Sequence, residues 1–570
     1  MSKEIENALA GAYSHYENGK YDVAEQWVSN VLAPNPFHVK ALHLGAMIAS
    51  ERGDHALAQA RLQTAYSKQP NDPELLNTLG NIQSKQHDYT RAEMAYRMAI
   101  EAAPDMIAPR QNLAFMLSRQ NLPTVALREF DTLIKMQPEN ANFQIGRIYA
   151  LKDCGHTQAA LDALEALGEG RMAKGQAALL KAQLSMDGEA MDKLAGHARR
   201  AYLDDDAMGA KALAVAVQGL SMAGNETAAL STANDALSQE RGGPNLMAAA
   251  GRALYDLGYE AEGAQALKKG LKKFQAAPEI LVTQAEMALH SGDAETAHTL
   301  AFQALKSRPA DMNIMPVFAR AALACGKVED AMIAAEAALK VNPNNQFWIA
   351  ILATGGRLKG QDYGYYYNYD KFVRSYDLSA PAGFKDMAEF NGALSKALHE
   401  LHGYKNAPLD QSLRMGTQTH KDLRFSDSPV IHSFFSLLES PISKYMDAIG
   451  QDPSHPLTRR NSGKYRINGA WSVRLTAGGH HVNHVHPQGW ISSAYYVDVP
   501  DEVADEKSKN GWIGFGAPPL DIPEIAKPEL MIKPKPGRLV LFPSYMWHGT
   551  LPITGDKPRL TLPFDVIPAP

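Results

Sequence analysis

A small residue and a proline recur at constant spacing in the first part of the chain, and this repeat constrains the fold more than any other feature. Each series advances in steps of 34 residues: the alanines are Ala24, Ala58, Ala92 and Ala126, and the prolines are Pro36, Pro70, Pro104 and Pro138. Helices pack closely where a side chain is small, and proline ends a helix because it lacks an N–H group and clashes with the preceding turn. The spacing therefore predicts stacked helical hairpins.

This pattern resembles the tetratricopeptide repeat, in which each helical hairpin carries a small pair on its first helix. Leu79-Gly80 and Leu113-Ala114 fit that pair. The register becomes irregular after residue 165 and returns later, at Ala297, Pro309, Ala331 and Pro343. We expect roughly nine or ten hairpins over residues 1–350. A solenoid of this kind commonly binds a protein or peptide on its concave face, although a rigid spacer is an alternative.

The composition changes after the repeats. A connector over residues 351–380 is rich in tyrosine, with Tyr363, Tyr365, Tyr366, Tyr367, Tyr369 and Tyr376 close together. Such a cluster more often packs two domains together than binds a ligand, because aromatic side chains bury a large area. Two further stretches, residues 384–404 and 428–450, have a helical period. The polar stretch 407–420 between them has no period and predicts an ordered loop.

The last part of the chain consists of short runs of β-branched and aromatic residues separated by Gly and Pro. Closely spaced strands without helices between them indicate an antiparallel barrel or sandwich, and about 110 residues suit a jelly-roll barrel of about eight strands. The expected fold is thus an all-α solenoid followed by a double-stranded β-helix barrel with flanking helices. We place the second domain at residues 381–570 and its barrel at about 460–570.

Four histidines crowd into the stretch "HHVNHVHPQGW" at residues 480–490. If His484 and His486 lie on a strand, their side chains share one face and can reach one metal ion. His548, at the end of the run "LVLFPSYMWHG", is the candidate for the third ligand. His480 and His481 lack this spacing and predict a solvated or hydrogen-bonded loop. The alternative is that the three later histidines are only hydrogen-bonded residues of the barrel.

The order of these motifs resembles the Fe(II)- and 2-oxoglutarate-dependent oxygenases. "HVHPQGWISSAYYV" and "GRLVLFPSYMWHGT" are similar to the two metal-binding segments of prolyl-hydroxylase-like members, and "KPRLTLPFDV" is similar to the strand that anchors 2-oxoglutarate. The resemblance implies that His484 and His548 bind iron. It also implies that Arg559 binds the distal carboxylate of 2-oxoglutarate, assisted by the Thr561 hydroxyl, and that Tyr496 hydrogen-bonds the cosubstrate.

One position departs from the family. His486 stands where most members have Asp or Glu, whereas the usual triad of two histidines and one carboxylate leaves three open positions on Fe(II). A third neutral imidazole lacks one negative charge, so the site should bind a dication less strongly. Either His486 is a ligand, or it lies behind the ligands with water in its place. Asp498 is a remote carboxylate candidate.

Three polar residues near the metal motif are candidates for contacts behind the ligands. Asn483 and Gln488 flank the motif, and Arg474 lies in the preceding run of β-type residues. Such residues fix the tautomers of metal-binding imidazoles.

The resemblance implies a dioxygenase that uses Fe(II), 2-oxoglutarate and O2 and needs no catalytic side chain beyond its metal ligands. Recruitment by the repeats suggests hydroxylation of a protein or peptide. Two alternatives stay open. One is a non-catalytic repeat scaffold with a degenerate barrel. The other is an oxoglutarate-independent, cupin-like metal dioxygenase or a zinc-binding barrel, since three histidines also suit zinc.

Composition limits the partners and the compartment. Lys and Arg number 57 against 62 Asp and Glu, so the chain has no broad basic surface of the kind that binds nucleic acid. No apolar run is long enough to predict a membrane span. The two cysteines, Cys154 and Cys325, are far apart in sequence and form no metal or disulfide motif. We therefore expect a cytoplasmic protein.

Overall fold

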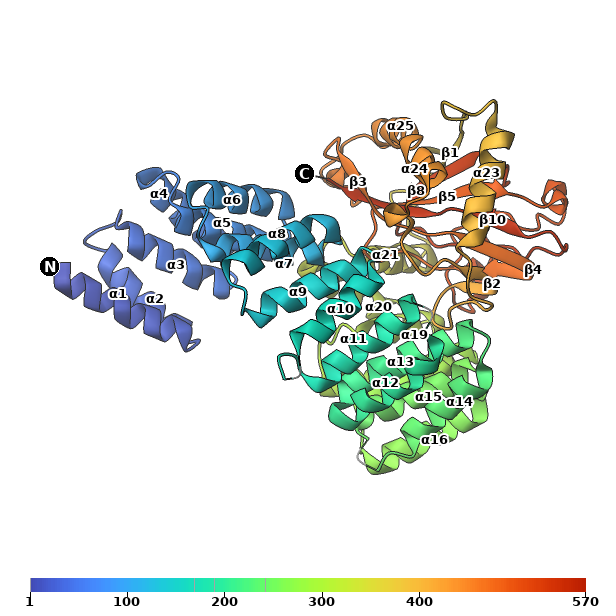
Figure 1. Cartoon of the computed structure of the whole chain (residues 1–570), viewed down its shortest axis with the longest axis horizontal. Coiled ribbons are helices and arrows are strands. Elements are labelled where there is room, and N and C mark those ends of the chain that lie inside the picture. The colour runs from blue at the N-terminus through green and yellow to red at the C-terminus, as the bar shows by residue number, and fades with distance from the viewer. Residues whose placement is uncertain (1, 169, 189, 241, 570) are drawn as a thin grey trace. The chain divides into compact units, whose positions relative to one another are not determined.

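The computed structural model of the chain describes residues 2–168, 170–188, 190–240 and 242–569. It divides into two compact units, Met1–Arg171 and Met172–Ala569. The first unit contains helical repeats alone, and the second contains further repeats together with the β-rich domain (Figure 1).

The N-terminal unit is a row of helical hairpins. Its helices are α1 (Ser2–Glu17), α2 (Tyr21–Leu32), α3 (Val39–Glu51), α4 (His55–Lys68), α5 (Pro73–Lys85), α6 (Tyr89–Ala102), α7 (Ile107–Arg119), α8 (Pro123–Met136), α9 (Ala141–Asp153) and α10 (Thr157–Leu167). The repeated alanines are fully buried, which explains their spacing in the sequence: they are Ala24, Ala58, Ala92, Ala126 and Ala160.

The turn inside each hairpin requires a left-handed residue at the same place. Gly53, His87, Asn121 and Gly155 occupy it at the 34-residue step, with φ between 57° and 78°. Glycine adopts this conformation without strain, and asparagine tolerates it better than most residues. The repeat is thus set by backbone geometry at the turn as well as by side-chain size at the helix crossing.

The repeats continue in the C-terminal unit. Its helices before the connector are α11 (Lys174–Asp187), α12 (Met191–Asp204), α13 (Asp206–Met222), α14 (Glu226–Leu237), α15 (Pro244–Asp256), α16 (Glu260–Lys273), α17 (Pro278–His290), α18 (Ala294–Ser307), α19 (Met315–Ala324), α20 (Val328–Val341) and α21 (Gln346–Leu358). Successive helices from α1 to α20 pair into ten hairpins, and α21 follows as a single helix. The predicted repeat region is confirmed.

The β-rich domain contains two sheets with antiparallel pairing. Its strands are β1 (Arg374–Asp377), β2 (Leu413–Gln418), β3 (Tyr465–Ala470), β4 (Val473–His481), β5 (Ile491–Asp498), β6 (Ile513–Phe515), β7 (Leu530–Ile532), β8 (Arg538–Pro543), β9 (His548–Thr550), β10 (Arg559–Thr561) and β11 (Phe564–Pro568). In the larger sheet the order is β1-β8-β5-β10-β4-β2, and β11 pairs with both β3 and β5. In the smaller sheet β6 lies between β7 and β9.

Four helices accompany these sheets: α22 (Tyr369–Phe372), α23 (Met387–Glu400), α24 (Pro429–Ser436) and α25 (Glu439–Ile449). The prediction of a loop over residues 407–420 is wrong, because this stretch contains β2. Leu413 and Thr417 of β2 are buried, whereas the residues between them are less so. A short strand at the edge of a sheet therefore shows little apolar pattern in its sequence.

Helix α21 and the tyrosine-rich segment pack against the β-rich domain. The Trp547 Nε1 group donates to the Thr354 hydroxyl on α21 at 2.9 Å. Arg357, also on α21, forms an ion pair with Glu529 at 3.1 Å. Tyr367 is buried, and its hydroxyl accepts a hydrogen bond from the Trp547 backbone N–H. The repeats of the C-terminal unit and the β-rich domain thus share a packed interior.

The repeats make a second set of contacts with the segment that precedes β2. The Tyr404 hydroxyl donates to the Met186 carbonyl at the end of α11 at 2.8 Å. The Asn406 side chain donates to the Ser221 carbonyl on α13, also at 2.8 Å. The segment that leads into the β-sheet is therefore held by the repeats.

These two sets of contacts between the repeats and the β-rich domain predict that this domain is not stable without the helices that precede it. A fragment of residues 172–570 should unfold in one cooperative transition followed by circular dichroism. A fragment of residues 363–570 exposes Trp547 and loses the Arg357–Glu529 pair, so it should show no such transition. Equal melting temperatures for the two fragments would contradict this prediction.

Candidate metal centre

Three histidines from two segments meet at the end of the β-rich domain. His484 follows β4 and forms an isolated antiparallel bridge with His548, the first residue of β9. The backbone N–H of His484 donates to the His548 carbonyl at 2.9 Å, and the reverse bond is 3.0 Å long. His486 is held by a bond from its own N–H to the Ser544 carbonyl. The expected regular strand through His484 and His486 is absent from the described structure, because only this one bridge forms.

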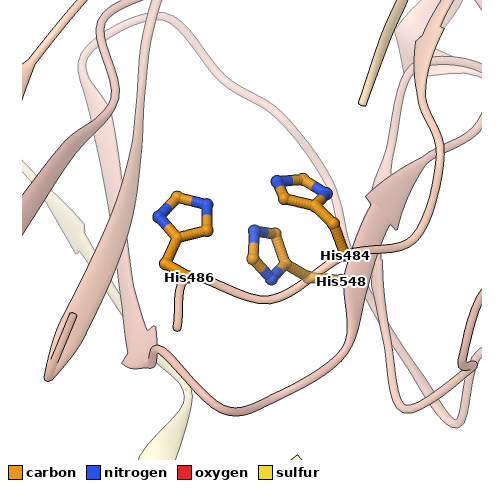
Figure 2. A group of neighbouring side chains, drawn as sticks. All are labelled: His484, His486 and His548. Atoms are coloured by element: carbon orange, nitrogen blue, oxygen red, sulfur yellow. The ribbon is translucent and has the colours of Figure 1, made fainter. Parts of the chain in front are cut away.

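Hydrogen bonds select one tautomer for two of these imidazoles. His484 Nδ1 donates to the Val482 carbonyl, and His548 Nδ1 donates to the Met546 carbonyl, each at 2.9 Å. A carbonyl can only accept, so Nδ1 carries the proton and Nε2 keeps its lone pair. Figure 2 shows the two rings beside that of His486, and one ligand atom from each of the three lies within 4.8 Å of the others.

His486 has a different partner. Its Nδ1 lies 2.7 Å from both carboxylate oxygens of Asp565 on β11. The carboxylate is held in turn by Ser492 on β5, whose hydroxyl donates to Asp565 at 2.7 Å and lies 2.8 Å from the Ser544 hydroxyl. Asp565 is not among the site residues that the sequence motifs indicate. Its one signal is a lone carboxylate inside the apolar run "LPFDVIP".

Burial and the Asp565 carboxylate act on the charge of the three imidazoles in opposite directions. Burial, together with the neighbouring His486, lowers the pKa of His484 to about 3. Burial and His484 likewise hold the pKa of His548 well below its usual range. Burial also acts to lower the pKa of His486, but the Asp565 carboxylate outweighs it and leaves that pKa raised. His484 and His548 are therefore neutral near pH 7, which is the form that binds metal ions.

Helix α21 contacts the neighbours of two of the histidines. The Gln346 backbone N–H, at the start of α21, donates to the carbonyl of Pro487, the residue after His486. The bond from Trp547 to Thr354 holds the residue before His548. One helix therefore restrains both segments that carry the cluster.

The histidines line a cavity of about 480 Å³. The structure brings all six metal-binding and cosubstrate-binding candidates to its wall: His484, His486, His548, Tyr496, Arg559 and Thr561. The remaining lining includes Trp471, Val485 and Phe542, and polar groups from Gln411, Ser412 and Gln418. In the described part of the chain, no carboxylate lines this cavity.

Arg559 is buried without a carboxylate partner. Its Nη1 donates to the Gly511 carbonyl, but its Nε has no hydrogen-bond partner among the described residues. The buried Tyr496 hydroxyl also has none there, and the Arg559 guanidinium lies 5.9 Å from the centre of the Tyr496 ring. Burial raises the pKa of Tyr496 to about 12, so its hydroxyl stays protonated and can donate. Thr561 is also buried, and its hydroxyl lies 3.5 Å from the Val473 carbonyl.

The other sequence candidates lie elsewhere. Arg474 on β4 and Asn483 are not part of the cavity wall, and Gln488 is exposed after the metal segment. Asp498 accepts a hydrogen bond from Ser395 and does not line the cavity.

The prediction of a loop for His480 and His481 is wrong, since both belong to β4. His481 lines the cavity, and its Nδ1 lies 3.0 Å from the Ser412 hydroxyl.

The Arg559 guanidinium favours binding of an anionic ligand, but without that ligand it should lower the free energy of unfolding. Arg559→Met should raise the free energy of unfolding of the ligand-free protein by about 1–4 kcal/mol, because a buried charge with poor compensation is replaced by an apolar side chain. Urea denaturation measures this change. Arg538→Met is the control, since Arg538 pairs with the exposed Asp377 and should change stability by less than about 1 kcal/mol. A lower stability for Arg559→Met would contradict the prediction.

Two family models match parts of the chain. The model described as "Putative 2OG-Fe(II) oxygenase" matches residues 469–565, a range that includes the three histidines, Arg559 and Asp565. A tetratricopeptide repeat model matches residues 43–107. Nothing among curated proteins matches the chain.

The solved structures that are similar to parts of the chain include the following two. The Pseudomonas aeruginosa pilF protein is 16% identical over 35% of this chain and 90% of its own, with a TM-score of 0.32. A tetratricopeptide repeat protein from Parabacteroides merdae is 16% identical over 49% of this chain and 97% of its own, with a TM-score of 0.31. From the two family matches, the chain carries tetratricopeptide repeats followed by a domain of the 2-oxoglutarate- and Fe(II)-dependent oxygenase family, for which Fe(II) and 2-oxoglutarate are the implied cofactors.

Proposed function

We propose that the protein is a 2-oxoglutarate-dependent dioxygenase that hydroxylates a protein or peptide recruited by its repeats. The observation that carries the proposal is the joint presence, in one cavity, of three converging histidines and a buried arginine without an anionic partner.

The three imidazoles fit a divalent iron ion. In two of them Nδ1 carries the proton and Nε2 keeps its lone pair, with the Ser412 hydroxyl 3.5 Å from the Nε2 of His484. The third is held at Nδ1 by Asp565, which leaves its Nε2 available. Iron bound together with 2-oxoglutarate and O2 would supply the oxidising power for hydroxylation of a C–H bond, with succinate and CO2 as the other products. The protein's part is to hold the ligands and to exclude bulk water.

Arg559, Tyr496 and Thr561 would bind the distal carboxylate of 2-oxoglutarate. A buried guanidinium is costly when no anion lies beside it, and a buried hydroxyl without a partner adds to that cost. A carboxylate would relieve both, because it accepts hydrogen bonds from the Arg559 Nε and from the Tyr496 hydroxyl. The apolar walls at Val485 and Phe542 would strengthen these interactions by excluding water.

The N-terminal unit offers a groove for a peptide. A cavity of about 390 Å³ there is lined by Asn81, Lys85, Tyr96, Asn112 and Arg119, among others. The Asn112 side chain donates to Asn81, so two hydrogen-bonded amide groups lie on its wall. Amide groups suit a peptide backbone, and Arg119 suits an acidic residue, whereas Lys85 is already paired with Glu51 on the same wall at 2.6 Å.

A zinc-binding or oxoglutarate-independent barrel is the second candidate. Three histidines alone suit zinc as well as iron. Arg559 favours the first proposal, since neither rival gives a buried guanidinium a role.

The proposal predicts separate losses for the two halves of the site. The full-length protein, purified without oxygen, should bind Fe(II) and form succinate from 2-oxoglutarate when oxygen is added. His484→Ala and His548→Ala should lose iron affinity by about 100-fold or more, since each removes a ligand. Arg559→Ala should keep iron affinity but raise the Kd for 2-oxoglutarate by about 100-fold, because charge-assisted bonds are lost.

Arg538→Ala serves as the control because its surface ion pair with Asp377 lies outside the cavity. Iron binding without any effect of 2-oxoglutarate would favour the second candidate. Failure to bind any divalent metal would favour a non-catalytic scaffold.

A further inference from the structure

We infer that Asp565 is a positioning residue that supplies, through His486, the negative charge that this three-histidine ligand set lacks. The inference rests on the proposed ligation of iron by His486, but it does not depend on any step of the reaction.

The contact between the two side chains fixes the His486 ring. Both carboxylate oxygens lie 2.7 Å from Nδ1, so the ring is held by a bifurcated contact on the side away from the cavity. The Trp471 ring lies beside it, tilted by 35° with the ring centres 5.9 Å apart. The remaining nitrogen, Nε2, is therefore the one available to a metal ion.

The hydrogen-bond partners of the other two imidazoles carry no charge. His484 and His548 each bond a backbone carbonyl through Nδ1. Only His486 bonds a carboxylate, and it stands at the position where the resemblance places a carboxylate ligand. A charge on Asp565 acts on the bound cation through one imidazole, and it raises the basicity of the ligating nitrogen. The set of three imidazoles and Asp565 then has the same formal charge as two histidines and one carboxylate.

The carboxylate is oriented before any metal binds. Ser492 donates to one of its oxygens, and the strand pairing of Asp565 with Ser492 places the two residues opposite each other. Within the described residues, His486 is the one basic side chain in an ion pair with Asp565. In the part of the chain that the structure describes, the charge is therefore directed at the histidine cluster and no lysine or arginine forms an ion pair with it.

Two variants separate charge from orientation. Asp565→Asn keeps the size and an acceptor oxygen but removes the charge. Ser492→Ala keeps the charge but removes the hydroxyl that orients it. Asp498→Asn is the matched control, because this carboxylate also accepts a hydrogen bond from a serine hydroxyl, that of Ser395, whereas Asp565 accepts from both Ser492 and His486.

The experiment titrates the full-length protein with Fe(II) and with Co(II) under anaerobic conditions, and it records the visible absorption of the cobalt form. Asp565→Asn should weaken the affinity for both ions by about 10- to 100-fold and shift the cobalt bands, because the donor strength of His486 falls. Ser492→Ala should weaken affinity by less than Asp565→Asn does. Asp498→Asn should match the wild type.

An affinity for Asp565→Asn within about twofold of wild type, with unchanged cobalt bands, would overturn the inference and leave the proposed function intact. A wild type that binds neither ion would overturn both. Thermal unfolding checks that each variant is folded. If Asp565→Asn does not fold, Ser492→Ala decides: weakened binding supports the inference, and wild-type binding overturns it.

Discussion

The histidine cluster depends on helix α21, the last helix of the repeat region. Its first residue, Gln346, holds the carbonyl of Pro487, and Thr354 holds the indole of Trp547. These contacts restrain the residue after His486 and the residue before His548. The bridge between His484 and His548 then brings the two segments together. A solenoid helix thus serves as part of the scaffold of a site that otherwise consists of strands and loops.

A second property of the site is the distribution of charge among its side chains. Two imidazoles are made neutral by burial, one is paired with a carboxylate, and one guanidinium is left without an anion. The guanidinium without an anion is costly for folding alone and favours an anionic ligand. The neutral imidazoles favour a metal cation through their lone pairs, and the carboxylate beside His486 favours it through its charge. A cation beside the histidines and an anion beside Arg559 are the ligands that this distribution suits.

Much of the fold could be predicted because its signals are local or periodic. The 34-residue step reflects one turn geometry and one helix crossing repeated along the chain, so it is visible without tertiary information. His484, His486, His548 and Arg559 could be proposed as neighbours in one site because their order and spacing resemble a known arrangement, and all four line one cavity. Asp565 could not, since its role comes from the pairing of β11 with β5, which brings it beside Ser492 and His486. Strand β2 was missed because an edge strand with few buried residues leaves little pattern.

The boundary in composition and the boundary in structure do not coincide. The sequence changes character after α21, near the tyrosine-rich segment, whereas the two compact units divide at residue 171. For the evolution of such chains, this means that recombination at the change in composition would separate Thr354 from Trp547 and cut through a shared interior. Exchange or duplication of hairpins before residue 171 alters the N-terminal compact unit and leaves this shared interior intact. The number of N-terminal repeats can therefore vary among descendants of such a gene more freely than the pairing of α11–α21 with the β-rich domain.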